Sequence, residues 1–151
     1  MHDFGTDEIE EMADLAAGLS LSEPTREDLY TMGYNFYNHG KYDEAASCFA
    51  TLALSDSSNA KHWMGLGAAQ QMNKKFEEAL GAYSFAALTD VLSPRPSMHA
   101  AECFFALKRI PEGLAALEAA EILAQAKEED HCLLSRLAAM RETNINHVDK
   151  E

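Results

Sequence analysis

Proline and glycine are scarce in this chain, with only 4 and 8 among its 151 residues. A β-sandwich or barrel of this length needs many tight turns, which these two residues usually supply. Alanine, leucine, glutamate and methionine are frequent instead, and all four favour helices. The composition therefore predicts an all-α protein, and the length fits a single domain.

Cysteine is also too sparse to organise a fold. Cys48, Cys103 and Cys132 are far apart, odd in number and outside any C-x-x-C pair, which excludes a disulfide framework or a zinc site. His99 lies one turn before Cys103, and His131 adjoins Cys132, but packing explains each pair better than metal binding. No glycine-rich phosphate loop or nucleophile elbow is present. We therefore expect no enzyme activity, no metal and no cofactor.

Positive charge is in short supply, since 12 Lys and Arg face 25 Asp and Glu, for a formal net charge of −13. Residues 1–28 alone hold nine acidic residues against one basic residue, Arg26. Such a surface repels phosphate, so nucleic acid and anionic membranes are poor partners. The acid serves either solubility or the steering of a basic partner.

Long apolar runs are missing as well. The N-terminus is acidic and lacks the apolar region of a secretion signal. The most apolar stretch, residues 79–88, is too short to cross a membrane. Together with the cysteine usage, this favours a cytoplasmic protein that does not act on membranes.

The chain does contain an internal repeat with a period of 34 residues. A shift by this number aligns a small residue, a bulky residue before a helix and a large apolar residue in the next helix: Gly33, Gly67 and Ala101; Tyr42, Phe76 and Ile110; Phe49, Tyr83 and Leu117. Thirty-four is the tetratricopeptide period, in which each unit is a pair of antiparallel helices. The small residue of the first helix lets the second helix approach closely. The third repeat is degenerate, which is typical of a terminal unit.

The repeat predicts three tetratricopeptide units that form a right-handed α-solenoid with a concave groove. We expect helices over residues 22–38, 42–54, 60–72, 76–88, 95–107 and 111–124, with a C-terminal capping helix over 127–141. The repeat domain would span residues 22–142. An acidic amphipathic helix within residues 1–21 would precede it, and residues 143–151 would form a disordered tail.

Three tyrosines on the first helix indicate a binding surface. Tyr30, Tyr34 and Tyr37 have the spacing i, i+4, i+7, which places them on one stripe turned away from the core residues of that helix. The stripe faces either the groove or a wider core packed against the N-terminal helix. The equivalent groove residues of the later repeats are Lys61, Met64, Ala68, Gln71, Met98, Glu102 and Phe105. This lining suits an extended apolar segment, and it lacks the lysines and asparagines of clamps that hold a C-terminal carboxylate.

Several stretches resemble the class II chaperones of bacterial type III secretion, of the SycD, LcrH and IpgC kind. They are residues 30–37, 63–71 and 83–88, and above all 94–103, which contains the run His-Ala-Ala-Glu-Cys. The resemblance implies that the groove holds an extended segment from hydrophobic translocator proteins, which stay soluble, unassembled and export-competent. Two departures are Ser97-Met98, where the family usually has an aromatic residue, and Lys74-Lys75, where it usually has glycine.

The N-terminal segment also carries an expectation. Ile9, Met12 and Leu15 form an apolar face that must be buried, either on the first repeat or on a second copy of the chain. The resemblance favours a second copy and therefore a homodimer. Two alternatives for function stay open. One is a tetratricopeptide chaperone of a needle subunit, which would hold a helix. The other is a general scaffold or transcriptional co-regulator.

Overall fold

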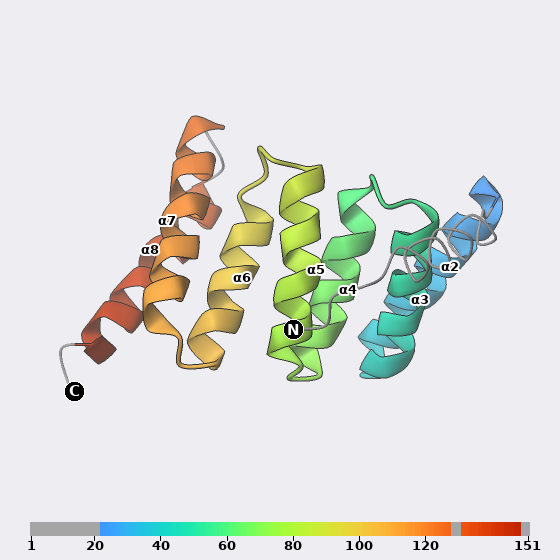
Figure 1. The fold of residues 1–151 in the computed structure, drawn as a ribbon, viewed down its shortest axis with the longest axis horizontal. Helices are drawn as coiled ribbons and strands as arrows, with labels where there is room; N and C mark the ends of the chain where they lie inside the picture. The colour runs from blue at the N-terminus through green and yellow to red at the C-terminus, as the bar shows by residue number, and fades with distance from the viewer. Residues whose placement is uncertain (1–21, 128–130, 149–151) are drawn as a thin grey trace, which may run out of the picture.

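The computed structural model describes residues 22–127 and 131–148, and these residues are all-α. They form helices α2 (Glu23–Asn38), α3 (Tyr42–Ser55), α4 (Ala60–Met72), α5 (Phe76–Thr89), α6 (Arg95–Ala106), α7 (Ile110–Ala126) and α8 (His131–Val148). The helices follow one another in chain order along the long axis of the molecule (Figure 1). The predicted fold class, an array of helix pairs, is confirmed. Ile9, Met12 and Leu15, the proposed dimer contacts, lie outside the described residues.

The first six helices begin and end within two residues of their predicted bounds, but α8 differs. It runs to Val148, so residues 143–148 are helical, and the expectation of a disordered tail from residue 143 is wrong for them. In this last part of α8, two side chains bond to backbone carbonyls one turn earlier. The Thr143 hydroxyl donates to the Ala139 carbonyl at 2.9 Å, and the Asn144 amide donates to the Met140 carbonyl at 2.7 Å.

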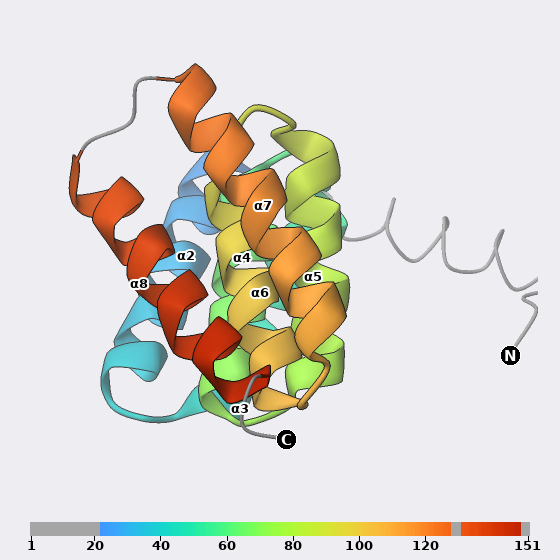
Figure 2. The same cartoon turned by 90° about the vertical axis from the view of Figure 1, so that its left-hand side faces the viewer.

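The helices lie in two layers. Seen along this axis, α2, α4, α6 and α8 form one layer, and α5 and α7 lie beside it (Figure 2). Helices α2, α4 and α6 are the first helices of the three repeats, and α8 takes the position of a first helix in a fourth. We call the surface formed by these four helices the inner face, because the predicted groove residues belong to it.

The core is built from large rings that lie against residues without side chains. Phe49 and Tyr83 are each 1% exposed. A Cβ atom on Gly67 would lie 2.6 Å from the Tyr83 ring, and one on Gly65 would lie 2.6 Å from the Phe49 ring. In the third repeat Ala101 and Leu117 occupy the corresponding positions, and both are fully buried. The small-and-large pattern read from the sequence is therefore the packing pattern of the core.

The turn inside each repeat needs one residue with positive φ. Gly40, Lys74 and Lys108 stand at this position, 34 residues apart, with φ values of 75°, 60° and 63°. Glycine adopts this conformation freely, whereas a lysine there is strained. At Lys74, where the resemblance leads one to expect glycine, the turn thus keeps the same backbone conformation although its residue is a lysine.

Candidate peptide-binding groove

Four of the predicted groove residues line one pocket on the inner face. Tyr30 and Tyr34 of α2 and Lys61 and Met64 of α4 enclose it, and its volume is about 280 Å³. Its remaining lining residues come from the start of α4, the α5–α6 loop and the start of α6: Ala60, Asp90, Ser93, Arg95 and Pro96. We call this the groove pocket. Successive first helices therefore build it together, as the repeat predicted.

The two tyrosines are fixed by contacts with each other and with the core. Their ring centroids are 4.9 Å apart, and each ring meets the Phe49 ring edge-on, at 5.8 Å for Tyr30 and 5.5 Å for Tyr34. The Tyr30 hydroxyl donates to the Tyr34 hydroxyl at 3.4 Å. Burial and this hydrogen bond raise the pKa of Tyr30, so its hydroxyl stays protonated. Tyr34 is 44% exposed and offers a rigid apolar surface to a ligand.

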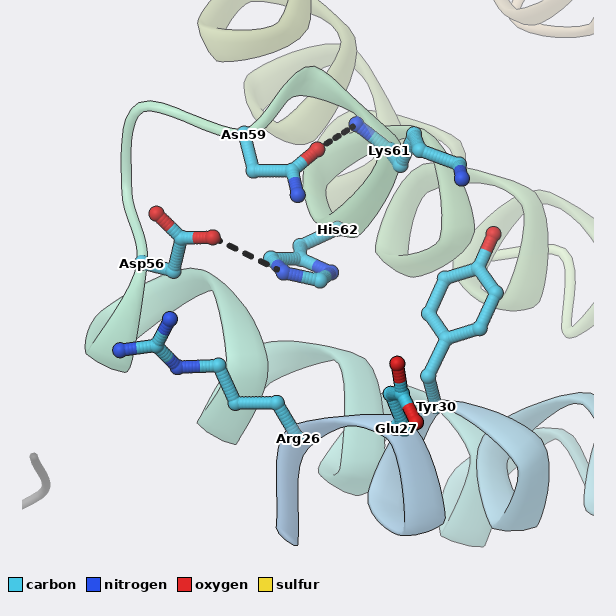
Figure 3. Close-up of a pocket in the computed structure, with 7 residues that line it drawn as sticks. All are labelled: Arg26, Glu27, Tyr30, Asp56, Asn59, Lys61 and His62. Atoms are coloured by element: carbon cyan, nitrogen blue, oxygen red, sulfur yellow. Dashed lines mark hydrogen bonds and ion pairs between the residues drawn. The ribbon is translucent and has the colours of Figure 1, made fainter. Parts of the chain in front are cut away.

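A second, polar pocket adjoins the groove pocket and shares Tyr30 and Lys61 with it. Its volume is about 200 Å³ (Figure 3), and its other lining residues are Arg26, Glu27, Asp56, Asn59 and His62. His62 is 6% exposed, and its Nε2 atom lies 3.5 Å from the Asp56 carboxylate. Burial lowers the pKa of His62 despite that carboxylate. His62 therefore lines the polar pocket as a neutral side chain.

Tyr37 and Ala68 lie on the inner face but outside the groove pocket. Tyr37 is half-buried, packs against the core around Phe49 and meets the Tyr42 ring at a centroid distance of 5.6 Å. Ala68 is partly buried. Tyr34 is thus exposed in the groove pocket, whereas Tyr37 mainly packs against the core and the Tyr42 ring.

Gln71 and Glu102 form the centre of a hydrogen-bond network on the inner face. The Tyr83 hydroxyl donates to Gln71 Oε1 at 2.7 Å, and Gln71 Nε2 donates to Glu102 Oε2 at 2.8 Å. His99 Nδ1 donates to the same carboxylate oxygen at 3.0 Å, and Arg136 of α8 donates to Oε1. We call these five residues the Glu102 network.

The network controls the charge of its central carboxyl. Burial alone would raise the pKa of Glu102, but hydrogen bonds from His99 and Gln71 and electrostatic attraction to His99 and Arg136 outweigh it and lower the pKa to about 2. The carboxylate is thus ionised at any ordinary pH, and its hydrogen-bonding capacity is already used by the protein.

Met98 does not line the groove, and that prediction is wrong. The side chain is fully buried in a cluster with Ala101, Leu133 and Leu137. Leu133 and Leu137 belong to α8, which therefore covers the inner face of the third repeat. Phe105 is half-buried and packs on α7, where its ring would lie 2.4 Å from a Cβ atom on Gly113. Phe105 thus serves packing rather than the groove pocket.

Sequence reasoning missed the contributions of the α5–α6 loop and of Arg95. The loop residues Asp90 and Ser93 belong to no helix pattern, so nothing in the sequence indicated them. Arg95 did carry a signal, because it lies 34 residues after Lys61 and occupies the same place in the next repeat.

The residues considered for metal binding have other contacts. His99 stacks on the Tyr83 ring at a centroid distance of 5.4 Å, besides its bond to Glu102. Cys103 is fully buried in the core beside Tyr83. Within residues 22–127 and 131–148 no three His, Cys, Asp or Glu side chains gather as a metal site would require. Nor is any helix in these ranges long and apolar enough to cross a membrane.

A row of helix pairs with an apolar pocket built across successive first helices defines a tetratricopeptide-repeat protein of the peptide-binding kind. Residues 30–90 match the family described as "Tetratricopeptide repeat". Among curated proteins, the chain is 34% identical over 122 residues to the Low calcium response locus protein H of Yersinia pestis, covering 81% of this chain and 73% of that protein.

Two solved structures extend the likeness to three dimensions. PcrH in complex with the chaperone binding region of PopD is 38% identical, with a TM-score of 0.79 over 84% of this chain and 96% of PcrH. The Yersinia enterocolitica type III secretion chaperone SycD, in complex with a peptide of the translocator YopD, is 33% identical, with a TM-score of 0.78 over 86% and 98%. The chain belongs to the family of type III secretion translocator chaperones.

Proposed function

We propose that this chain is a cytoplasmic chaperone that holds an extended apolar segment of hydrophobic translocator proteins in its groove. The observation that carries the proposal is the groove pocket between α2, α4 and α6, in a chain of which 84% superposes on 96% of PcrH. PcrH and SycD were each solved with a segment of a translocator, PopD or YopD. The chaperone keeps its cargo soluble, unassembled and export-competent, and it catalyses nothing.

The energetics of the pocket suit transient holding. Each apolar side chain that becomes buried contributes about 1.5–3 kcal/mol. Two or three such side chains, less the cost of ordering an extended segment, give a dissociation constant on the order of micromolar. Tyr34 is preordered by Phe49 and Tyr30, so it presents its ring at little entropic cost. Full-length cargo adds contact area and binds more tightly.

The substitution Tyr34→Ala tests the proposal. It is expected to weaken binding of the YopD peptide by about 1–3 kcal/mol, since a rigid exposed aromatic is a typical hot spot. Titration calorimetry measures the affinity, and circular dichroism confirms unchanged helicity. Phe85→Ala is the matched control, because Phe85 is an exposed aromatic on α5 outside the groove pocket. Equal affinities for both variants and the parent chain would refute the site.

The bound conformation separates this function from the alternatives. A translocator segment in an extended conformation supports the proposal, whereas a helical ligand would favour a needle-subunit chaperone. A SycD structure described as an alternative dimer motivates a second proposal, that this chain forms a homodimer through Ile9, Met12 and Leu15. Light scattering of the chain with and without residues 1–21 measures it, and a dimer that survives the deletion would exclude that contact.

A further inference from the structure

Two basic side chains stand at the rim of the groove pocket in positions where basic residues are disfavoured. Lys61 and Arg95 lie in the first turns of α4 and α6, and neither first turn contains an acidic residue. The N-terminal end of a helix carries partial positive charge, so acidic residues stabilise it and basic residues do not. Both helices accept this cost at equivalent places, one repeat apart.

Neither of these cations is neutralised within the described part of the chain. Other basic residues of the chain do form ion pairs, each with a carboxylate: Lys75, Arg109, Arg136 and Arg141. Lys61 and Arg95 have no carboxylate within 4 Å among the described residues. Lys61 instead places its ammonium 5.5 Å from the centre of the Tyr30 ring. Figure 3 shows its side chain extending toward Tyr30 and away from Asp56.

The carboxylates nearby do not cancel this charge. Asp90 is the acidic residue that lines the groove pocket, against Lys61 and Arg95. Asp56, in the adjoining pocket, contacts His62. Glu27 also lines the adjoining pocket but forms no ion pair with Lys61 or Arg95. Within the groove pocket itself two cations thus face one carboxylate, in a chain whose formal net charge is −13. The positive charge borders an apolar cavity, where electrostatic interactions are stronger than in open water.

We propose that Lys61 and Arg95 select cargo segments that carry an acidic side chain next to the apolar side chain that fills the groove pocket. The proposal rests on the function proposed above and specifies its ligand. The apolar anchor supplies affinity, and the neighbouring carboxylate pairs with the ammonium and the guanidinium. Charge complementarity of this kind contributes more to the choice of partner and to register than to total affinity.

A peptide series with the YopD peptide as its parent tests the selection. Every acidic residue of the peptide is first replaced by its amide. A single glutamate, or a glutamine as its neutral counterpart, is then placed at each position of the peptide in turn. Calorimetry at low salt should reveal one position at which glutamate binds roughly three- to tenfold more tightly than glutamine, the range expected for exposed or half-exposed pairs with two cations. The preference should shrink in about 0.5 M salt.

The matching variants of the chain locate the effect. The double substitution Lys61→Gln and Arg95→Gln should abolish the glutamate preference. The readout is the ratio of the affinities for the glutamate and glutamine peptides, so a loss of affinity that both peptides share does not count. The control pair Lys41→Gln and Lys127→Gln, two exposed lysines outside the groove pocket, should keep the preference. Loss of the preference in both pairs would overturn the proposal.

The two proposals fail in different ways. If the neutral peptides bind but no position prefers glutamate, the selection by Lys61 and Arg95 is refuted and the chaperone function stands. If no peptide of the series binds the parent chain, the proposed function itself is refuted, and the selection falls with it.

Discussion

The two ends of the inner face are built from the same repeat but offer opposite surfaces. Around α2 and α4 the face is open, and Tyr34 presents its ring to solvent beside Met64. Around α6 and α8 the face is closed, because Met98 is fully buried in one cluster with Leu133 and Leu137 of α8. The Glu102 network belongs to this closed end, since Arg136 of α8 pairs with Glu102. An α-solenoid can thus set the length of its binding groove by how far the terminal helix reaches over the inner face.

The closed end also explains why the third repeat tolerates a degenerate sequence. Two of its inner-face residues, Met98 and Glu102, pack or pair with residues of α8 instead of lining the groove pocket. Glu102 illustrates this, since it occupies the position of Tyr34 and Ala68 but pairs with Arg136. Arg136 lies 34 residues further on, at the equivalent place of α8. At these equivalent positions, the last two helices of the inner face, α6 and α8, are joined by an ion pair, whereas the first two, α2 and α4, line a pocket.

The largest expected loss of stability comes from a substitution at the contact between Gly67 and Tyr83, in the core beneath both ends. Tyr83 packs its ring against Gly67 and begins the Glu102 network with its hydroxyl. Gly67→Leu would force the ring away and should cost more than about 3 kcal/mol, which lowers the melting temperature by roughly 10 °C or abolishes the transition. Thermal unfolding followed by circular dichroism measures this.

Gly81 provides the matched control for that substitution. It lies on exposed α5 surface, and a Cβ atom there would meet nothing within 4 Å. Gly81→Leu should leave the melting temperature unchanged or raise it, because leucine favours a helix more than glycine does. If Gly67→Leu melts within about two degrees of the parent, the packing of the Tyr83 ring on Gly67 is not as tight as described.

A smaller effect is expected from Glu102→Gln, which tests the closed end. The pKa of Glu102 is lowered to about 2 in the folded chain, against roughly 4.3 when unfolded. A lowered folded-state pKa stabilises the protein above the unfolded pKa, and this stability is lost as the pH falls through about 2. The parent should therefore lose up to about 3 kcal/mol more than the variant between pH 4.5 and 2. Urea unfolding across this range measures the difference.

Two controls tie that result to the comparison between the ends. Glu78→Gln, at an exposed residue of α5, should keep the pH dependence of the parent. At neutral pH, where both proteins are folded, Glu102→Gln should bind the YopD peptide as the parent does, because the network lies outside the groove pocket. A large loss of affinity would show that the ligand reaches the Glu102 network and that the closed end belongs to the groove.

The sequence predicted the fold well because the 34-residue period encodes contacts within and between neighbouring units. It also predicted four residues of the groove pocket, Tyr30, Tyr34, Lys61 and Met64, since equivalent positions of a solenoid share a face. It failed at Met98 because the position of α8 depends on tertiary packing beyond the repeat. The Glu102 network was not predicted for a similar reason, because its hydrogen-bonded partners lie up to 34 residues apart and meet only in the folded chain.

The smallest expected effect concerns the turns, where the first repeat again differs from the later ones. Gly40 fills the left-handed position in the first repeat, whereas Lys74 and Lys108 hold it in the second and third. A left-handed conformation costs an L-residue about 1–2 kcal/mol, which a glycine would avoid. Glycine also loses more conformational entropy on folding, and this loss offsets part of the gain in stability. Lys108→Gly should therefore stabilise the chain by about 0.5–1 kcal/mol.

Denaturant unfolding resolves a change of this size, and Lys41→Gly is the control. Lys41 lies in the turn next to Gly40 with a φ of −88°, a conformation that any residue adopts. Glycine there should leave stability unchanged or lower it slightly, because the folded chain gains nothing while the unfolded chain becomes more flexible. Equal gains at both positions would show that removing positive side chains, and not relieving the backbone, stabilises the protein. A gain at Lys108 alone would mean that the later repeats carry local strain that the first repeat avoids.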